Sequence, residues 1–151
     1  MKTLTLAIRQ LPSAEGLPFP TYQSAEAAGF DLAAAIPENE PVELSPGARA
    51  LIPTGLIFEL PAGTEAQVRP RSGLALSAGV TVLNAPGTVD SDYRGEIKVI
   101  LVNHGAEPFK VVRGMRIAQC VVAPVLRIEI SASETTRETD RGAGGFGSTG
   151  L

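Results

Sequence analysis

Short apolar stretches separated by glycine and proline run along most of this chain. Near its start, Leu4, Leu6 and Ile8 alternate with polar residues, which is the period-two pattern of a strand buried on one face. Further apolar stretches predict strands at residues 29–34, 48–58, 64–69, 80–83, 95–102, 108–112 and 116–130, the last divided in two near Pro124. The 16 glycines and 12 prolines fall mainly between these stretches. Many short strands at regular spacing favour an antiparallel sandwich, jelly roll or barrel.

Helical periodicity is weak throughout the chain. No segment sustains an apolar stripe with a 3.6-residue repeat, and only the stretch SGLALSAG, residues 72–79, predicts a helix, of about two turns. Ser72 is its expected N-cap, because a serine hydroxyl can accept a hydrogen bond from the first unpaired backbone N–H groups.

A different composition begins at residue 131. Residues 131–151 are polar and glycine-rich, so they cannot bury enough surface to offset the entropy lost on ordering. We therefore expect a β domain over residues 1–130 and a flexible C-terminal segment over residues 131–151. This segment holds one aromatic residue, Phe146, and a late arginine, Arg141. A lid that closes over a ligand needs such a stacking ring and anion-binding group.

Composition restricts the chemistry that the chain can carry. A chain of 151 residues can bury a core without disulfides or a structural metal. With one cysteine, Cys120, in an apolar stretch and one histidine, His104, at an expected strand end, a Cys/His zinc cluster is excluded. Any metal should therefore be a hard ion held by oxygen atoms. The lack of disulfide pairs suits a reducing cytosol, and we expect a cytoplasmic protein.

The charge pattern restricts the partners. The formal net charge is −3, and basic residues are scattered singly, which argues against binding to nucleic acid polymers. Two or three converging arginines would still suffice for a small anionic ligand. No stretch approaches the roughly 20 apolar residues of a membrane helix, and the first residues are too interrupted for a signal peptide, so we expect no membrane association.

The stretch LNAPGTVDSDYRGEIKV, residues 83–99, concentrates polar groups in a turn-rich segment between two apolar strands. Asn84, Asp90, Asp92, Tyr93 and Arg94 lie on the expected long hairpin loop. Asp90 follows an apolar residue, so its carboxylate either faces a pocket or belongs to a solvated acidic hairpin tip.

Three other segments carry candidate chemistry. Arg71, Ser72 and Gly73 lead into the expected helix. Its first backbone N–H groups, the serine hydroxyl and the guanidinium could together bind phosphate. The alternative is that these residues form only a helix cap beside a surface arginine. On a strand, Arg116 and Ala118 would share one face, with Ile117 and Gln119 on the other. Gln119 is then either satisfied by backbone or directed at a ligand. Asp31 is a lone carboxylate in an apolar strand, so it is paired with an arginine or serves an ion.

These segments, together with the tail, resemble the five ordered motifs of the trimeric dUTP diphosphatases (dUTPases). The motifs are, in order, AAGFDL, RPRSGLAL, LNAPGTVDSDYRGEI, GMRIAQ and RGAGGFGSTG, and they span residues 27–150. Five motifs in sequence are far more specific than one. Phe30 stands where the family often has tyrosine, a departure that concerns packing. The resemblance implies an all-β, jelly-roll-like antiparallel β-sandwich with one short helix, assembled as a homotrimer whose sites are shared between subunits.

The resemblance also implies a reaction. The family hydrolyses dUTP to dUMP and pyrophosphate by attack of water on the α-phosphate, with Mg²⁺ on the triphosphate, which limits uracil in DNA and supplies dUMP for dTMP synthesis. By similarity Asp90 is the general base, and Asp31 acts on Mg²⁺ indirectly, through water. The phosphates would be bound by Arg71, Ser72, Gly73 and Gln119. Arg141 would reach the γ-phosphate once the tail closes.

Nucleoside recognition is implied for the hairpin. Its backbone, at Thr88 and Val89 among others, would present donors and acceptors to the uracil edge together with the Asn84 amide. Lys98, expected across the hairpin from Asn84, would complete that edge with its backbone. Tyr93 would support the deoxyribose where a ribose 2′-hydroxyl clashes, and Phe146 would stack on the uracil.

Two alternatives stay open on the sequence. A dCTP deaminase on the same fold would need a glutamate at C4 of cytosine and lacks this glycine-rich tail. A catalytically silent nucleotide-binding trimer, or a structural trimer of capsid type, would not need Asp90, Arg71, Tyr93 and Phe146 together.

Overall fold

The protein is described by a computed structural model over residues 4–145, and its elements are almost entirely β-strands. The strands are β1 (Ala7–Gln10), β2 (Phe30–Ala33), β3 (Val42–Leu44), β4 (Arg49–Glu59), β5 (Thr64–Arg69), β6 (Val80–Val82), β7 (Gly87–Val89), β8 (Glu96–Asn103), β9 (Phe109–Val111) and β10 (Arg116–Pro124). A 3₁₀ turn, η1 (Pro12–Ala14), and one α-helix, α1 (Ser72–Ala78), complete the order. No helix in the described part is long and apolar enough to span a membrane.

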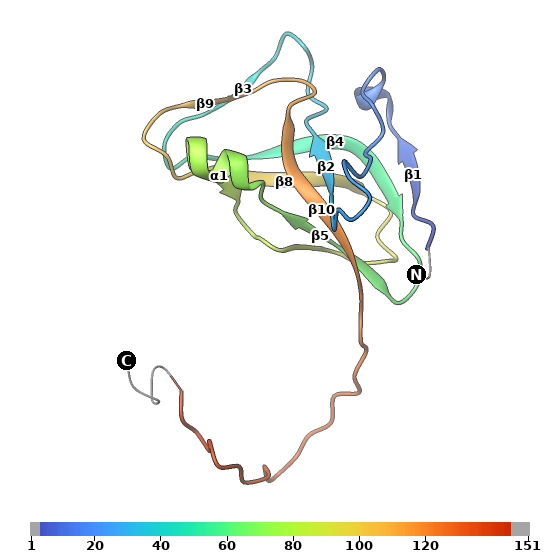
Figure 1. Cartoon of the computed structure of the whole chain (residues 1–151), viewed down its shortest axis with the longest axis vertical. Coiled ribbons are helices and arrows are strands. Elements are labelled where there is room, and N and C mark those ends of the chain that lie inside the picture. The colour runs from blue at the N-terminus through green and yellow to red at the C-terminus, as the bar shows by residue number, and fades with distance from the viewer. Residues whose placement is uncertain (1–3, 146–151) are drawn as a thin grey trace.

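Two four-stranded antiparallel sheets pack around one core (Figure 1). One sheet has the order β1-β4-β8-β6, the other β2-β10-β5-β7, and β3 pairs with β9 in a separate two-stranded ribbon. Fully buried side chains from both sheets meet in the core, among them Ile52, Phe58 and Leu101 from the first and Leu32 and Ile117 from the second. The predicted all-β antiparallel sandwich with one short helix is confirmed. Cys120 is completely buried in this core, as its apolar neighbours indicated.

The 83–99 hairpin connects the two sheets. Its flanking strands β6 and β8 pair antiparallel, with Val82 opposite Leu101, as the pattern predicted. Between them lies β7, which was not predicted and pairs with β5 of the other sheet. β7 and β3 have three residues each and lie outside any longer apolar stretch, so periodicity did not reveal them. The reactive segment is therefore anchored to both sheets.

Three sequence expectations are wrong. The helix begins at Ser72, and Arg71 is the N-cap, with an extended backbone and no side-chain capping bond, because the first helical bond runs from Ala75 N–H to Arg71 O. A register shift between Arg116 and Ala118 breaks the strict alternation of β10, so these two residues do not share a face: Arg116 is exposed and Ala118 is buried.

The third correction concerns the end of the β domain. β10 ends at Pro124, and the second strand expected over residues 125–130 is absent. Its apolar residues alternate as in a strand, but within residues 4–145 no strand pairs with them, and Val125 N–H donates to Gly63 O in a loop at 2.9 Å. From β10 onward the chain leaves the sandwich and extends away from it (Figure 1). Leu126, Ile128 and Ile130 are consequently 87%, 74% and 89% exposed.

Candidate active site

Two arginines converge on the carboxylate of Asp31. Arg71 Nε donates to Asp31 Oδ1 at 2.9 Å, and Arg116 Nη1 donates to Oδ2 at 3.0 Å. Arg71 also donates through Nη1 to the backbone oxygen of Arg116 at 3.1 Å. The three residues come from β2, the segment before α1, and β10, so the sheet order brings them together. Of the two alternatives for Asp31, the arginine pair is what the structure contains; Arg116 was not among the predicted site residues.

Gln119 lies beside Asp31 in the sheet. In the β10 register it stands opposite Asp31 on one side and Arg69 on the other. Its Nε2 donates to Pro70 O at 3.0 Å, so the amide nitrogen is satisfied by backbone beside the phosphate-binding candidate Arg71. A side chain at Gly29 would meet Cys120 O at 2.9 Å and Gln119 Oε1 at 3.2 Å, which explains the glycine before Phe30 and Asp31.

The start of α1 is open to solvent. Ser72 and Gly73 are both exposed, and a Cβ added to Gly73 would meet nothing within 4 Å. The chain itself therefore does not require glycine at this position. The open space leaves room for a ligand to approach the backbone beside Arg71.

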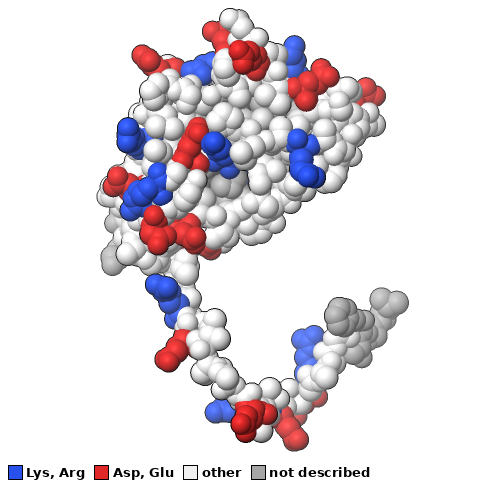
Figure 2. Space-filling view, turned by 180° about the vertical axis from the view of Figure 1, so that it is seen from behind, with Lys and Arg blue, Asp and Glu red and all other residues white. Residues whose placement is uncertain are grey.

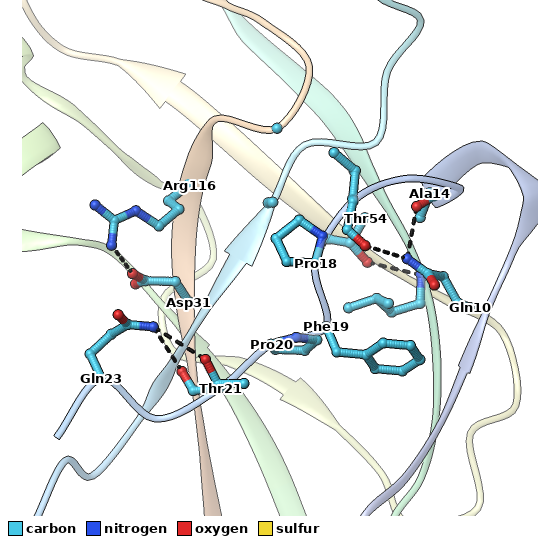
Figure 3. A pocket seen from close by; sticks show the side chains of 14 residues that line it. Gln10, Ala14, Pro18, Phe19, Pro20, Thr21, Gln23, Asp31, Thr54 and Arg116 are labelled. Carbon is cyan, nitrogen blue, oxygen red and sulfur yellow. Dashed lines mark hydrogen bonds and ion pairs between the residues drawn. The ribbon is translucent and has the colours of Figure 1, made fainter. Parts of the chain in front are cut away.

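Asp31 and Arg116 also line a pocket of about 340 Å³ (Figure 3). Pro18, Phe19 and Pro20 form its other side. The loop that carries them is fixed by Gln10 of β1, whose Nε2 donates to Ala14 O at 2.7 Å and Leu17 O at 2.9 Å. Hydrogen bonds from Arg113 also fix this region, and the sequence analysis missed them because the bonded residues are distant in the chain. Arg113 donates to the backbone oxygens of Ser13, Glu15 and Ile36 at 2.7–3.0 Å.

The hairpin residues surround a separate pocket. Thr88, Val89, Asp90, Tyr93 and Lys98 line a cavity of about 320 Å³ with Leu51, Glu96 and Ile97. A second pocket, of about 540 Å³, shares Thr88 and Asp90 and continues to Val125 and Arg127. Asp90 is exposed and borders both cavities. A carboxylate in this position is accessible to water and to a ligand in either pocket.

Short-range hydrogen bonds fix the shape of the hairpin tip. Tyr93 N–H donates to Asp90 O at 3.1 Å, and the Tyr93 hydroxyl donates to Glu96 O at 3.2 Å. Arg94 Nη1 donates to Ser91 O at 2.8 Å. Glu96, which the sequence reasoning did not single out, accepts from Gly55 N–H of β4 at 2.8 Å and lies 3.7 Å from Lys98 Nζ. The base of the hairpin is thereby hydrogen-bonded to β4.

Asn84 lies in the turn that follows β6, and Lys98 lies in β8. Val82 pairs with Leu101, and Leu83 N–H donates to Ile100 O at 2.8 Å. The pairing of β6 with β8 ends there, and Asn84 follows in the turn. On its other side, Lys98 is opposite Pro53 of β4. Asn84 is exposed, with its amide beside Gly87.

Within one chain, Asp90 and the arginine cluster lie at opposite ends of β5. Val89 pairs with Ala66, so Asp90 follows on the side of Glu65, whereas Arg71 comes after the last residue of β5, Arg69. At roughly 3.4 Å per strand residue, the stretch from Glu65 to Arg71 spans about 20 Å. A single copy of the described chain therefore does not bring the predicted base and the predicted phosphate ligands to one point.

Of the two tail candidates, the structure describes only Arg141, in the segment that extends away from the sandwich (Figure 1). Arg141 is exposed and donates through Nε to Gly144 O at 2.9 Å within its own segment. Phe146 lies outside the described residues.

On the face in Figure 2, Lys and Arg side chains are interspersed with Asp and Glu, both on the body and along the tail. Within the described residues, no group of three or more His, Cys, Asp or Glu side chains forms a metal cage.

Comparisons with known proteins agree on one family. The dUTPase family model matches residues 15–150. The deoxyuridine 5′-triphosphate nucleotidohydrolase of Rhizobium meliloti (strain 1021) is 63% identical over 145 residues, which cover 96% of this chain and 91% of that protein. Two solved phage dUTPases share the fold. A variant from Staphylococcus bacteriophage 80alpha, with dUpNHpp, has a TM-score of 0.86 at 23% identity, covering 99% of this chain and 100% of that chain. A variant from phage phi11 of S. aureus, whose structure reveals the coordination of a structural Mg(II) ion, has a TM-score of 0.76 at 22% identity, covering 87% and 98%.

Proposed function

Because this chain belongs to the dUTPase family and is a dUTP diphosphatase, we propose that it cleaves dUTP to dUMP and pyrophosphate by attack of an Asp90-activated water on the α-phosphate. The observation that carries this mechanism is the position of Asp90, an exposed carboxylate at the rim of the pocket that Tyr93 lines. Water and substrate can both reach such a group, as a general base requires.

Asp90 orients the attacking water and takes its proton as the bond to phosphorus forms. The bond between the α-phosphorus and the bridging oxygen breaks, and pyrophosphate leaves with the electron pair. A positioned base contributes about 10²–10⁴-fold in rate. The remaining acceleration comes from orientation and from neutralised phosphate charge, because phosphoryl transfer needs little covalent help.

The phosphates are bound by Arg71, Ser72, Gly73 and Gln119. The cluster of two guanidiniums around one carboxylate carries one excess positive charge, and the open start of α1 adds backbone N–H groups. Arg141 reaches the γ-phosphate when the tail closes.

Mg²⁺ fits this donor set as an ion bound to the substrate. Asp31 uses one acceptor site on each oxygen for an arginine. A carboxylate has about four such sites, so Asp31 can also accept from metal-bound water. An ion that prefers phosphate oxygens and retained waters needs no cage of protein ligands. When bound, Mg²⁺ supplies charge neutralisation on the triphosphate.

The hairpin recognises the nucleoside. The backbone of Thr88 and Val89, the Asn84 amide and the Lys98 backbone are directed to the uracil edge. Cytosine would leave donors or acceptors unpaired there, and a site built for one hydrogen-bonding pattern can reject another by about 10⁴–10⁵. Tyr93 underlies the deoxyribose, and Phe146 covers the base after closure.

We propose a homotrimer because one chain cannot complete this site. The separation of about 20 Å between Asp90 and Arg71 along β5 exceeds what the α-phosphate could bridge if it contacts both. A second copy supplies one group, and a third the tail over residues 131–151. Self-association also has an apolar surface to use: Leu126, Ile128 and Ile130 are exposed, and a groove of about 1030 Å³ lies beside β1, lined by Leu6, Ile8, Tyr22, Phe30 and Val122 among others.

In the cell this reaction limits uracil incorporation into DNA and supplies dUMP for dTMP synthesis, and the enzyme acts in the cytoplasm. The direct test incubates the purified chain and Mg²⁺ with dUTP and with each common nucleoside triphosphate, and measures pyrophosphate and ammonia. Pyrophosphate from dUTP alone is the expected result. Ammonia release from dCTP would identify a deaminase instead, and binding of dUTP without pyrophosphate would identify a silent nucleotide-binding trimer.

A further inference from the structure

The ring of Tyr93 folds back onto the backbone of Gly95. A Cβ built on Gly95 would overlap the Tyr93 hydroxyl and ring and would stand 2.8 Å from Cε2. The hydroxyl in this position donates to Glu96 O at 3.2 Å. The ring is therefore held at two places: its hydroxyl end occupies the space that a side chain at residue 95 would take, and its hydroxyl is hydrogen-bonded to the backbone of the next residue.

Backbone conformation does not explain glycine at this position. Seven glycines of the described chain have a positive φ, which L side chains rarely adopt, and Gly95 is not one of them. An alanine could follow the same backbone path. What excludes a side chain is the aromatic ring that occupies its space.

We propose that Gly95 is a positioning residue that determines sugar specificity by fixing the Tyr93 ring on the hairpin. The inference rests on the proposed function, in which Tyr93 underlies the deoxyribose. Steric exclusion of a 2′-hydroxyl requires a platform whose position is fixed to a fraction of an ångström, because a ring that can retreat admits the extra oxygen. The missing side chain of Gly95 supplies that fixed position.

The neighbouring contacts support a rigid platform. Glu96 is itself held, because its carboxylate accepts from Gly55 N–H of β4 at 2.8 Å. Tyr93 N–H is engaged by Asp90 O at 3.1 Å, which links the ring's backbone to the proposed base. Tyr93 is still 46% exposed and lines a pocket, so it remains available to a ligand there.

The test compares kcat/KM for dUTP and UTP in the wild type and in Gly95→Ala. The added methyl must displace the ring and break its bond to Glu96 O, so the dUTP/UTP ratio should fall on the order of tenfold or more. The ratio does not depend on how much of a preparation is folded, because both substrates are assayed on the same sample. For variants too slow to assay with UTP, the ratio of inhibition constants for dUDP and UDP supplies the same comparison.

A double-mutant cycle separates positioning from general damage. In a Tyr93→Ala background the ring is gone, so adding Gly95→Ala should leave the ratio unchanged. Tyr93→Phe keeps the ring over Gly95 but removes the bond to Glu96 O, and it should lower the ratio less than Gly95→Ala does. An unchanged ratio in Gly95→Ala, or an equal fall in both backgrounds, overturns the inference.

The wild type distinguishes this failure from failure of the proposed function. If the wild type releases pyrophosphate from dUTP and Gly95→Ala discriminates against UTP equally well, only the role of Gly95 is refuted. If the wild type does not hydrolyse dUTP, the proposed function fails and the inference falls with it.

Discussion

Arg71 Nε lies 2.9 Å from Asp31 Oδ1, although 40 positions separate the two residues in the chain. The contact joins β2 to the segment that begins α1, and Arg116 closes it from β10. A single carboxylate thus orients two guanidiniums at the place proposed to receive phosphates. Its position is a consequence of the strand order β2-β10-β5.

Replacing Asp31 by Asn should destabilise the fold. The change removes the acceptor charge of two hydrogen bonds and leaves two guanidiniums close together, so we expect the free energy of unfolding to fall by about 1–3 kcal/mol, as measured by urea denaturation. Asp90→Asn is the matched control, because Asp90 is exposed and forms no ion pair in the described structure, and it should change stability by less than about 0.5 kcal/mol. Equal stability of the two variants would refute the structural role of Asp31.

The sequence predicted what is local and missed what depends on register. Asp90, Tyr93 and Thr88 line one pocket because they belong to one hairpin. The contact between Asp31 and Arg71 depends on pairing across three strands. Periodicity could therefore not decide whether Asp31 pairs with an arginine or serves an ion. The expected strand after Pro124 failed for the opposite reason: its alternating pattern is genuine, but pairing needs a neighbouring strand, and the part of the chain that the structure describes provides none.

Cys120 should be chemically inert in the native protein. Burial raises the pKa of its thiol to about 12, and the side chain is completely buried. The thiol form is therefore retained at pH 8, and iodoacetamide should label Cys120 only after unfolding by denaturant. Rapid labelling of the native protein, followed by mass spectrometry, would contradict this packing.

The same shift predicts a pH dependence of stability. A thiol whose pKa is raised on folding contributes stability that is fully present below the unfolded value of about 8.5 and is lost as pH rises toward the folded value of about 12. The free energy of unfolding should fall more steeply above pH 9 in the wild type than in Cys120→Ala. Parallel slopes would show that the thiol does not ionise on unfolding.

The tail should be needed for catalysis and dispensable for folding. Residues 131–143 are exposed, so deleting residues 136–151 should leave thermal unfolding and the number of chains in the assembly unchanged while dUTP turnover collapses. Full activity of the truncated protein would remove the proposed lid.

Stacking by the tail can be observed directly. The chain has no tryptophan, so Phe146→Trp introduces a single fluorophore at the position proposed to cover the uracil. Its fluorescence should be quenched by a non-hydrolysable dUTP analogue. The matched control places tryptophan at Phe109, in the separate β3–β9 ribbon, and should respond little. Identical responses would argue against stacking at Phe146.

The central claim is that Asp90 activates the attacking water, and the turnover of Asp90→Asn tests it most directly. Asparagine keeps the shape of the side chain but cannot take the proton, so kcat for dUTP should fall by about 10²–10⁴-fold while calorimetry shows the affinity for a non-hydrolysable analogue retained. Turnover close to that of the wild type would contradict the account.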